Sequence, residues 1–151
     1  MQTSRWQMTR SLAMAAAVAV MSCVGATSAS AQCIDPFQRG NWVSVDPNTR
    51  GITRAIIEFT CVDVITPGVP PPPSWHLTLF GQCHPFDCPW GRVPGRGGAG
   101  GAILASYDQG FATRAVRITR VGTRLNVRVA TNFRDPGRPD YVMNNLMRRA
   151  P

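Results

Sequence analysis

The sequence predicts an all-β domain, a small antiparallel barrel or sandwich of about seven to eight strands tied by disulfides, with little or no helix after an N-terminal leader. Three observations predict this class. Short runs of β-branched and aromatic residues recur along the chain, turns rich in Gly and Pro separate them, and four cysteines follow the leader. No stretch beyond the leader has a convincing helical period.

Residues 1–31 have the pattern of a cleaved export signal. Arg5 and Arg10 give a positive start, an apolar run over residues 11–20 follows, and the small residues at 29–31 fit a signal-peptidase site. The apolar run is shorter than the roughly 20 residues that a membrane-spanning helix needs. The sequence therefore predicts a signal peptide rather than a membrane anchor.

We accordingly expect a secreted or periplasmic protein in which residues 32–151 form a single β domain, with no transmembrane segment in the mature chain. The alternative is a lipoprotein anchored through Cys23, because the residues that precede Cys23 loosely resemble a bacterial lipobox.

The mature segment contains four cysteines, namely Cys33, Cys61, Cys83 and Cys88. An even number in an exported domain predicts disulfides, and four cysteines allow three pairings. We expect Cys83 to pair with Cys88 as a local clip and Cys33 to pair with Cys61 as the longer link. The alternative is a zinc site that also uses His76 and His84, but a Cys-x4-Cys spacing is not typical of zinc. We therefore expect no metal and no cofactor.

The first strands are indicated by alternation of apolar residues along the chain. Residues 41–45 alternate around Trp42, and residues 52–65 are rich in β-branched side chains. In the second run Ala55, Ile57 and Phe59 share one face of the predicted strand. The run of four prolines at residues 70–73 cannot continue a sheet.

Later strands are expected at residues 75–81, 102–107, 112–119 and 125–133. The last two form the clearest hairpin, which turns at Val121-Gly122-Thr123. Residues 91–101 hold six glycines and one proline, so we expect a flexible loop there. Residues 141–149 fit either a final strand or a short helix.

Two resemblances follow from short motifs. Gly40-Asn41-Trp42 is similar to the Gly-x-Trp motif of calycin barrels, lipocalin-like and avidin-like, in which the Trp closes one end of an up-and-down barrel. The pattern Cys83-His84-Pro85-x-Asp87-Cys88-x-Trp90-Gly91, with residues 41–52 and 133–141, resembles a group of uncharacterised secreted bacterial domains. These resemblances imply a fold and a location, and they imply no catalytic residue.

No set of residues indicates a catalytic site. Ser44, Ser74 and Ser106 lie in no Gly-x-Ser-x-Gly motif, and Asp46 and Asp135 precede prolines, which is typical of turns. We therefore expect a non-catalytic binding or structural module of the bacterial envelope or extracellular space. The alternatives are a small secreted hydrolase and a protease-inhibitor-like barrel.

The basic C-terminal third suggests where a partner could bind. The chain carries a formal net charge of +8 without any lysine, and nine of its arginines lie between residues 111 and 151. Arg117 and Arg128 should point away from the core of the hairpin and present a positive outer face. Such a face could bind an anionic envelope polymer, lipid headgroups or another exported protein, whereas export makes nucleic acid an unlikely partner. Phe86 and Trp90 in the cysteine loop are the other candidate binding residues.

Overall fold

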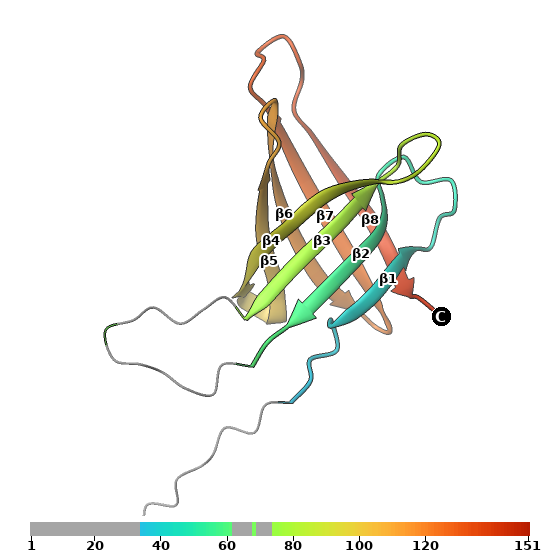
Figure 1. The fold of residues 1–151 in the computed structure, drawn as a ribbon, viewed down its shortest axis with the longest axis vertical. Helices are drawn as coiled ribbons and strands as arrows, with labels where there is room; N and C mark the ends of the chain where they lie inside the picture. The colour runs from blue at the N-terminus through green and yellow to red at the C-terminus, as the bar shows by residue number, and fades with distance from the viewer. Residues whose placement is uncertain (1–33, 62–67, 69–73) are drawn as a thin grey trace, which may run out of the picture. The chain divides into compact units, whose positions relative to one another are not determined.

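The computed structural model describes residues 34–61, 68 and 74–151, which form a closed antiparallel β-barrel (Figure 1). Its strands are β1 (Gly40–Ser44), β2 (Ile52–Phe59), β3 (Trp75–Gly81), β4 (Cys88–Gly98), β5 (Ala102–Asp108), β6 (Ala112–Val121), β7 (Arg124–Phe133) and β8 (Tyr141–Arg149). Each strand pairs with the next one in the chain, and β1 pairs with β8 to close the barrel. The structure thus confirms the all-β class and resolves the choice between barrel and sandwich.

Alternation of side chains positions the core as the sequence predicts. In β2, Ala55 and Ile57 are buried while Arg54 and Glu58 are exposed. The predicted hairpin is also confirmed, since β6 and β7 pair along ten residue pairs from Ala112–Phe133 to Val121–Arg124. Because successive side chains of a strand point to opposite faces, these registers send one apolar face into the barrel.

The expected flexible loop at residues 91–101 is wrong. This segment belongs to β4 and to a short 3-10 turn, η1 (Ala99–Gly101), that leads into β5. Gly95 is buried, and a Cβ there would lie 2.7 Å from Cδ1 of Leu77. Gly100 and Gly101 both have a φ of +70°, which glycine adopts without strain. The glycines therefore permit close packing and a sharp turn.

The structure also tests the expectations for residues 141–149 and for the pairing of the cysteines. Residues 141–149 form a strand, because β8 pairs with β7 on one side and with β1 on the other. The predicted Cys83–Cys88 disulfide is confirmed, with Cα atoms 5.5 Å apart. Cys61 is also disulfide-bonded. Cys33, Cys23 and the predicted leader at 1–31 lie outside the described residues.

The middle of the barrel is filled by apolar side chains. The core cluster comprises Trp42, Ile52, Ala55, Ile57, Leu77, Leu79, Ile103, Tyr107, Val116, Ile118, Leu125, Val127, Val129 and Met147. Trp75 and Trp90 are half-buried and pack against this cluster. Trp42, Trp75 and Trp90 therefore all contribute to the core of the barrel.

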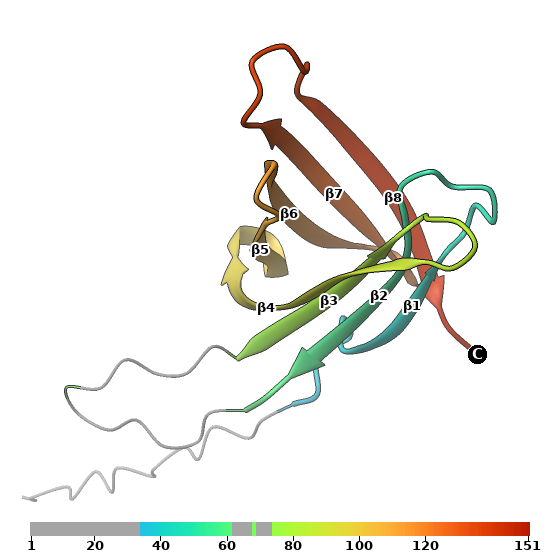
Figure 2. The same cartoon turned by 45° about the horizontal axis from the view of Figure 1, so that its top comes forward.

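One end of the barrel is closed by the segment that precedes β1. Nε1 of Trp42 donates a hydrogen bond to the carbonyl of Gln38, and the Arg149 guanidinium lies 4.5 Å from the Trp42 ring. Arg149 also donates hydrogen bonds to the carbonyls of Phe37 and Arg39. The opposite end, which we call the mouth, is surrounded by the loops at 45–51, 82–87, 109–111 and 134–140 (Figure 2).

Candidate functional site: the barrel mouth and an outer groove

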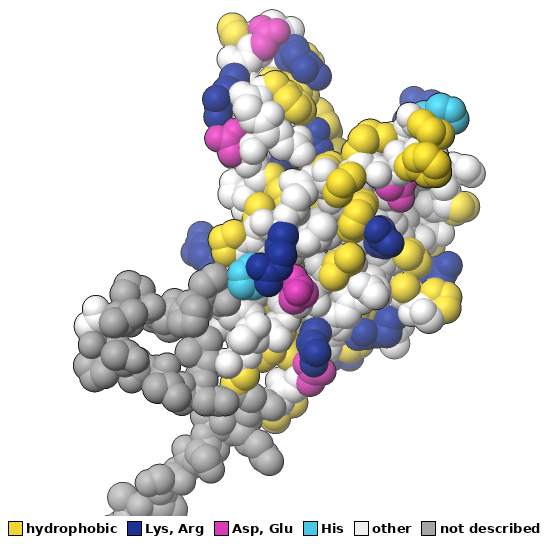
Figure 3. All heavy atoms as spheres, viewed as in Figure 1, with side chains coloured by type: hydrophobic (Ala, Val, Ile, Leu, Met, Phe, Trp, Pro, Cys, Tyr) yellow, Lys and Arg dark blue, Asp and Glu magenta, His cyan; other side chains and the backbone are white. Residues whose placement is uncertain are grey.

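The mouth contains a cavity of about 610 Å³. Its lining residues are Arg50, Gly51, Gly81, Gln82, Cys83, Cys88, Pro89, Trp90, Asp108, Gln109, Phe111, Arg114, Tyr141 and Met143. In the space-filling view it corresponds to the hollow between the β7–β8 tip and the β3–β4 loop (Figure 3). A cavity of this volume is large enough for a small organic ligand.

Arg114 extends into the barrel from β6. Its register partners are Tyr107 on β5 and Thr131 on β7, both of which are buried. The guanidinium lies 4.0 Å from the centre of the Trp90 ring, a cation–π geometry. Burial lowers the pKa of Arg114 from its ordinary value, although an arginine stays protonated at physiological pH.

One atom of this guanidinium and one atom of the neighbouring Thr131 lack hydrogen-bond partners. Nε of Arg114 and Oγ1 of Thr131 are both buried and unpartnered among the described residues. Arg114 also forms no ion pair within the described part of the chain, because Asp108, the one carboxylate that lines the mouth, accepts two hydrogen bonds from Arg134. Buried polar groups in native proteins nearly always have hydrogen-bond partners, so the lack of a partner for these two atoms is unusual.

The wall behind Arg114 is held by aromatic packing. Trp90 meets Tyr107 edge to face, with ring centres 5.6 Å apart. The Tyr107 hydroxyl donates a hydrogen bond of 2.9 Å to the Leu77 carbonyl, and burial raises the pKa of Tyr107 above its ordinary value. A Cβ at Gly81 would lie 2.8 Å from Nε1 of Trp90, so the glycine leaves room for the indole. Trp90 is therefore fixed before any ligand arrives.

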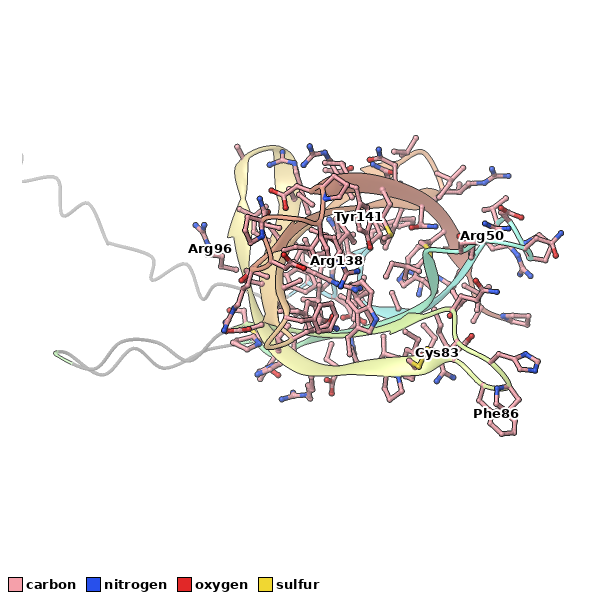
Figure 4. The ribbon with its side chains drawn as sticks, turned by 90° about the horizontal axis from the view of Figure 1, so that it is seen from above. Arg50, Cys83, Phe86, Arg96, Arg138 and Tyr141 are labelled. Atoms are coloured by element: carbon pink, nitrogen blue, oxygen red, sulfur yellow. A yellow bond between two sulfur atoms is a disulfide. The ribbon has the colours of Figure 1, made fainter. Side chains whose placement is uncertain are left out.

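Aromatic side chains also build the rim of the mouth. Phe133 stacks on Phe111, with ring centres 6.3 Å apart, and contacts Tyr141. The Arg138 guanidinium lies 3.9 Å from the Phe133 ring centre. Seen from above, Arg138 and Tyr141 lie over the barrel, whereas Phe86 points away from it (Figure 4). The rim thus offers flat apolar faces and the positive charge of Arg138, and Arg50 adds another positive charge to the lining of the mouth.

A second concave site lies on the outside of the barrel. Arg117 and Arg128 are exposed and occupy directly paired positions of β6 and β7, as the sequence predicts. They line a groove of about 570 Å³ together with Arg96, Leu104 and Ala115. Pro94, Gly95, Ala105, Ser106 and Val116 complete its lining.

The sequence-based candidates therefore separate into two sites and one exposed loop. Trp90 belongs to the mouth, and Arg117 and Arg128 belong to the outer groove. Phe86 is 81% exposed at the tip of the disulfide-closed loop and lines neither cavity.

The sequence alone does not single out Arg114, because it is one of nine arginines between residues 111 and 151. The signal that could have found it is its position between Ala112 and Val116 on the inward-facing register of β6. In an alternating strand, residues 112, 114, 116 and 118 must share one face.

The described residues contain no cluster of three or more His, Cys, Asp or Glu side chains that could hold a metal ion. Neither His76 nor His84 lines the mouth or the outer groove. Asp46 and Asp135 each accept a hydrogen bond from a backbone N–H two residues ahead, which confirms them as turn residues.

Comparison with known proteins adds no family to this description. No family model, no curated protein and no solved structure matches the chain. Across the described residues, no helix has the length and apolar character required to cross a membrane.

Proposed function

We propose that this chain is an exported, non-catalytic binding protein that holds a small organic monoanion at the barrel mouth. The observation that carries the proposal is Arg114, a half-buried arginine that lines the cavity and forms no ion pair with a described residue. The Cys83–Cys88 disulfide, the signal pattern at residues 1–31 and the likeness to secreted bacterial domains support the exported location.

The chemistry of these atoms favours a carboxylate. A guanidinium presents planar N–H donors that match the two oxygens of a carboxylate. Of the two arginines that line the cavity, Arg114 is half-buried and Arg50 is exposed to solvent, so Arg114 balances one negative charge of the ligand. The aromatic side chains of Trp90, Phe111 and Tyr141 favour an apolar or planar body on the same ligand.

The lining residues support binding rather than catalysis. Among the described residues that line the mouth there is no serine, threonine or histidine, and the two cysteines are joined in a disulfide. The carboxylate of Asp108 is held by Arg134. A nucleophile activated by a neighbouring base, which hydrolysis of an ester or amide commonly needs, is therefore missing from this lining.

Calorimetric titration with matched ligands tests the proposal. We expect the mature protein to bind 2-naphthoate and decanoate at least tenfold more tightly than the corresponding neutral amides. In Arg114→Met this preference for the carboxylate should disappear, whereas the amides should bind as before.

Arg117→Met is the control, because it removes the same chemical group from the outer face. It should bind all four ligands as the parent does. If Arg114→Met kept the preference for the carboxylate, or if none of the four ligands bound to the parent protein, the proposal would be wrong.

A further inference from the structure

We infer that the outer groove is a docking site for an acidic, extended segment of a second protein. This inference is independent of the mouth, because it concerns the opposite face of the sheet and a different set of arginines. It begins from the register of the strands, which places Arg96, Arg117 and Arg128 in one row across the barrel wall.

The row is continuous from strand to strand. Arg96 pairs with Leu104, Leu104 pairs with Arg117, and Arg117 pairs with Arg128. Figure 4 shows Arg96 pointing away from the barrel, and all three arginines are exposed. With neighbouring strands about 4.8 Å apart, the row spans roughly 14 Å, which is the length of about four residues of extended chain.

These charges are not balanced within the protein. Asp108 is the one carboxylate in strands β4 to β8, and it lies at the mouth end of β5 in an ion pair with Arg134. None of the three arginines of the row forms an ion pair with a described residue. Like charges directly opposite each other destabilise a sheet, so the pairing of Arg117 with Arg128 opposes folding. A bound row of carboxylates would relieve this repulsion.

The apolar side chains on the floor of the groove indicate which class of ligand would bind there. Leu104, Ala115 and Pro94 supply short apolar contacts, and among the described residues no aromatic side chain lines the groove. Sugars and nucleic-acid bases are generally bound on aromatic faces, so this floor is better suited to peptide side chains. A flat bilayer surface cannot reach the bottom of a concave site. The groove lies where β4, β5, β6 and β7 are paired with one another, so we expect recognition through side chains rather than through strand addition.

The test measures fluorescence anisotropy of labelled hexapeptides against the mature protein. A peptide of alternating Glu and Val should bind, and the matched Gln and Val peptide should bind at least tenfold more weakly. Affinity for the acidic peptide should fall as salt rises from 50 to 200 mM, because salt screens exposed charges.

Variants of equal charge separate the groove from general attraction. Arg117→Glu/Arg128→Glu should weaken binding of the acidic peptide at least tenfold. Arg124→Glu/Arg148→Glu changes the net charge equally at exposed positions outside the groove and should weaken it less than twofold. Arg96→Glu, on a different strand, should reproduce most of the loss if the double variant of the hairpin does not fold.

Equal losses in the two double variants would overturn the inference, since they would indicate attraction without a site. So would binding to vesicles that contain phosphatidylglycerol with no binding to the acidic peptide, because the groove would then serve a membrane surface. Unchanged binding of the mouth ligands in the groove variants is expected in every case.

Discussion

At the scale of single residues, Arg114 is an energetically unfavourable side chain for its position in the barrel. The desolvated guanidinium gains a cation–π contact with Trp90 of about 1–2 kcal/mol, but it lacks a carboxylate among the described residues. A hydrophobic side chain of similar length would fill the same space without the penalty of an unpaired charge. Native proteins tolerate such local conflicts mainly at functional sites, where the missing partner is supplied by a ligand.

Tyr107 supports a prediction about alkaline pH. Burial raises the pKa of Tyr107 above its ordinary value near 10, so the folded protein keeps a proton that the unfolded chain releases. Above about pH 10 the free energy of unfolding should therefore fall, by up to about 1.4 kcal/mol for each pH unit. Below pH 9 this contribution should be constant.

Urea denaturation of Tyr107→Phe between pH 8 and pH 11 is the measurement. The variant should lose about 1 kcal/mol at pH 8, through loss of the hydrogen bond to Leu77, and should show a shallower alkaline decline than the parent. Tyr141→Phe, which removes a phenol from the exposed rim, is the control. A parallel decline in the parent and in Tyr107→Phe would contradict the assignment.

At the scale of elements, β4 offers a test within one strand. Gly95 is enclosed, since an added Cβ would lie 2.7 Å from Leu77 and 3.1 Å from Trp75, whereas a Cβ at Gly97 would meet nothing within 4 Å. Gly95→Ala should lower the free energy of unfolding by about 1–3 kcal/mol through overpacking. Gly97→Ala should change it by less than about 0.5 kcal/mol or raise it slightly, because alanine restricts the unfolded chain. Equal effects in urea denaturation would show that this segment is not packed as a strand.

The same element shows what the sequence could and could not predict. Strands such as β3 and the β6–β7 hairpin were predictable, because a single apolar face leaves an alternating pattern. β4 was not, since its four glycines and two prolines remove the side chains from which alternation is recognised. Its strand structure depends on neighbours, namely β3 on one side and β5 on the other.

The residues of the two candidate sites also differ in whether the sequence could predict them. Outward positions such as Arg117 could be assigned from the local alternation of the hairpin. The mouth could not, because its walls come from five separate segments that only the closed barrel brings together. The Arg114 guanidinium stacks on Trp90 only because β4 and β6 come together in the barrel. No local sequence pattern predicts that contact.

At the scale of the whole molecule, the two ends of the barrel differ in how they are built. The end beside β1 is closed by Phe37, Trp42 and Arg149, whereas the mouth keeps a cavity of about 610 Å³. The closed end also stabilises the pairing of β1 with β8, which closes the barrel and which we call the seam. β1 and β8 share three paired positions, whereas β6 and β7 share ten, so the ladder between the first and last strands is much shorter than the β6–β7 ladder.

This asymmetry predicts different effects for two arginines that both stack on aromatic rings. Arg149→Met removes two hydrogen bonds to the carbonyls of Phe37 and Arg39 and the contact with Trp42, so we expect a loss of about 2 kcal/mol in the free energy of unfolding. Arg138→Met removes exposed contacts with Phe133 and Phe111, and the loss in the free energy of unfolding should stay below about 1 kcal/mol. Hydrogen exchange should locate the difference, because the amides of β1 and β8 should lose protection in Arg149→Met while those of β6 and β7 keep it. If both variants were equally stable, or if protection fell evenly around the barrel, the short β1–β8 seam would not depend on the closed end.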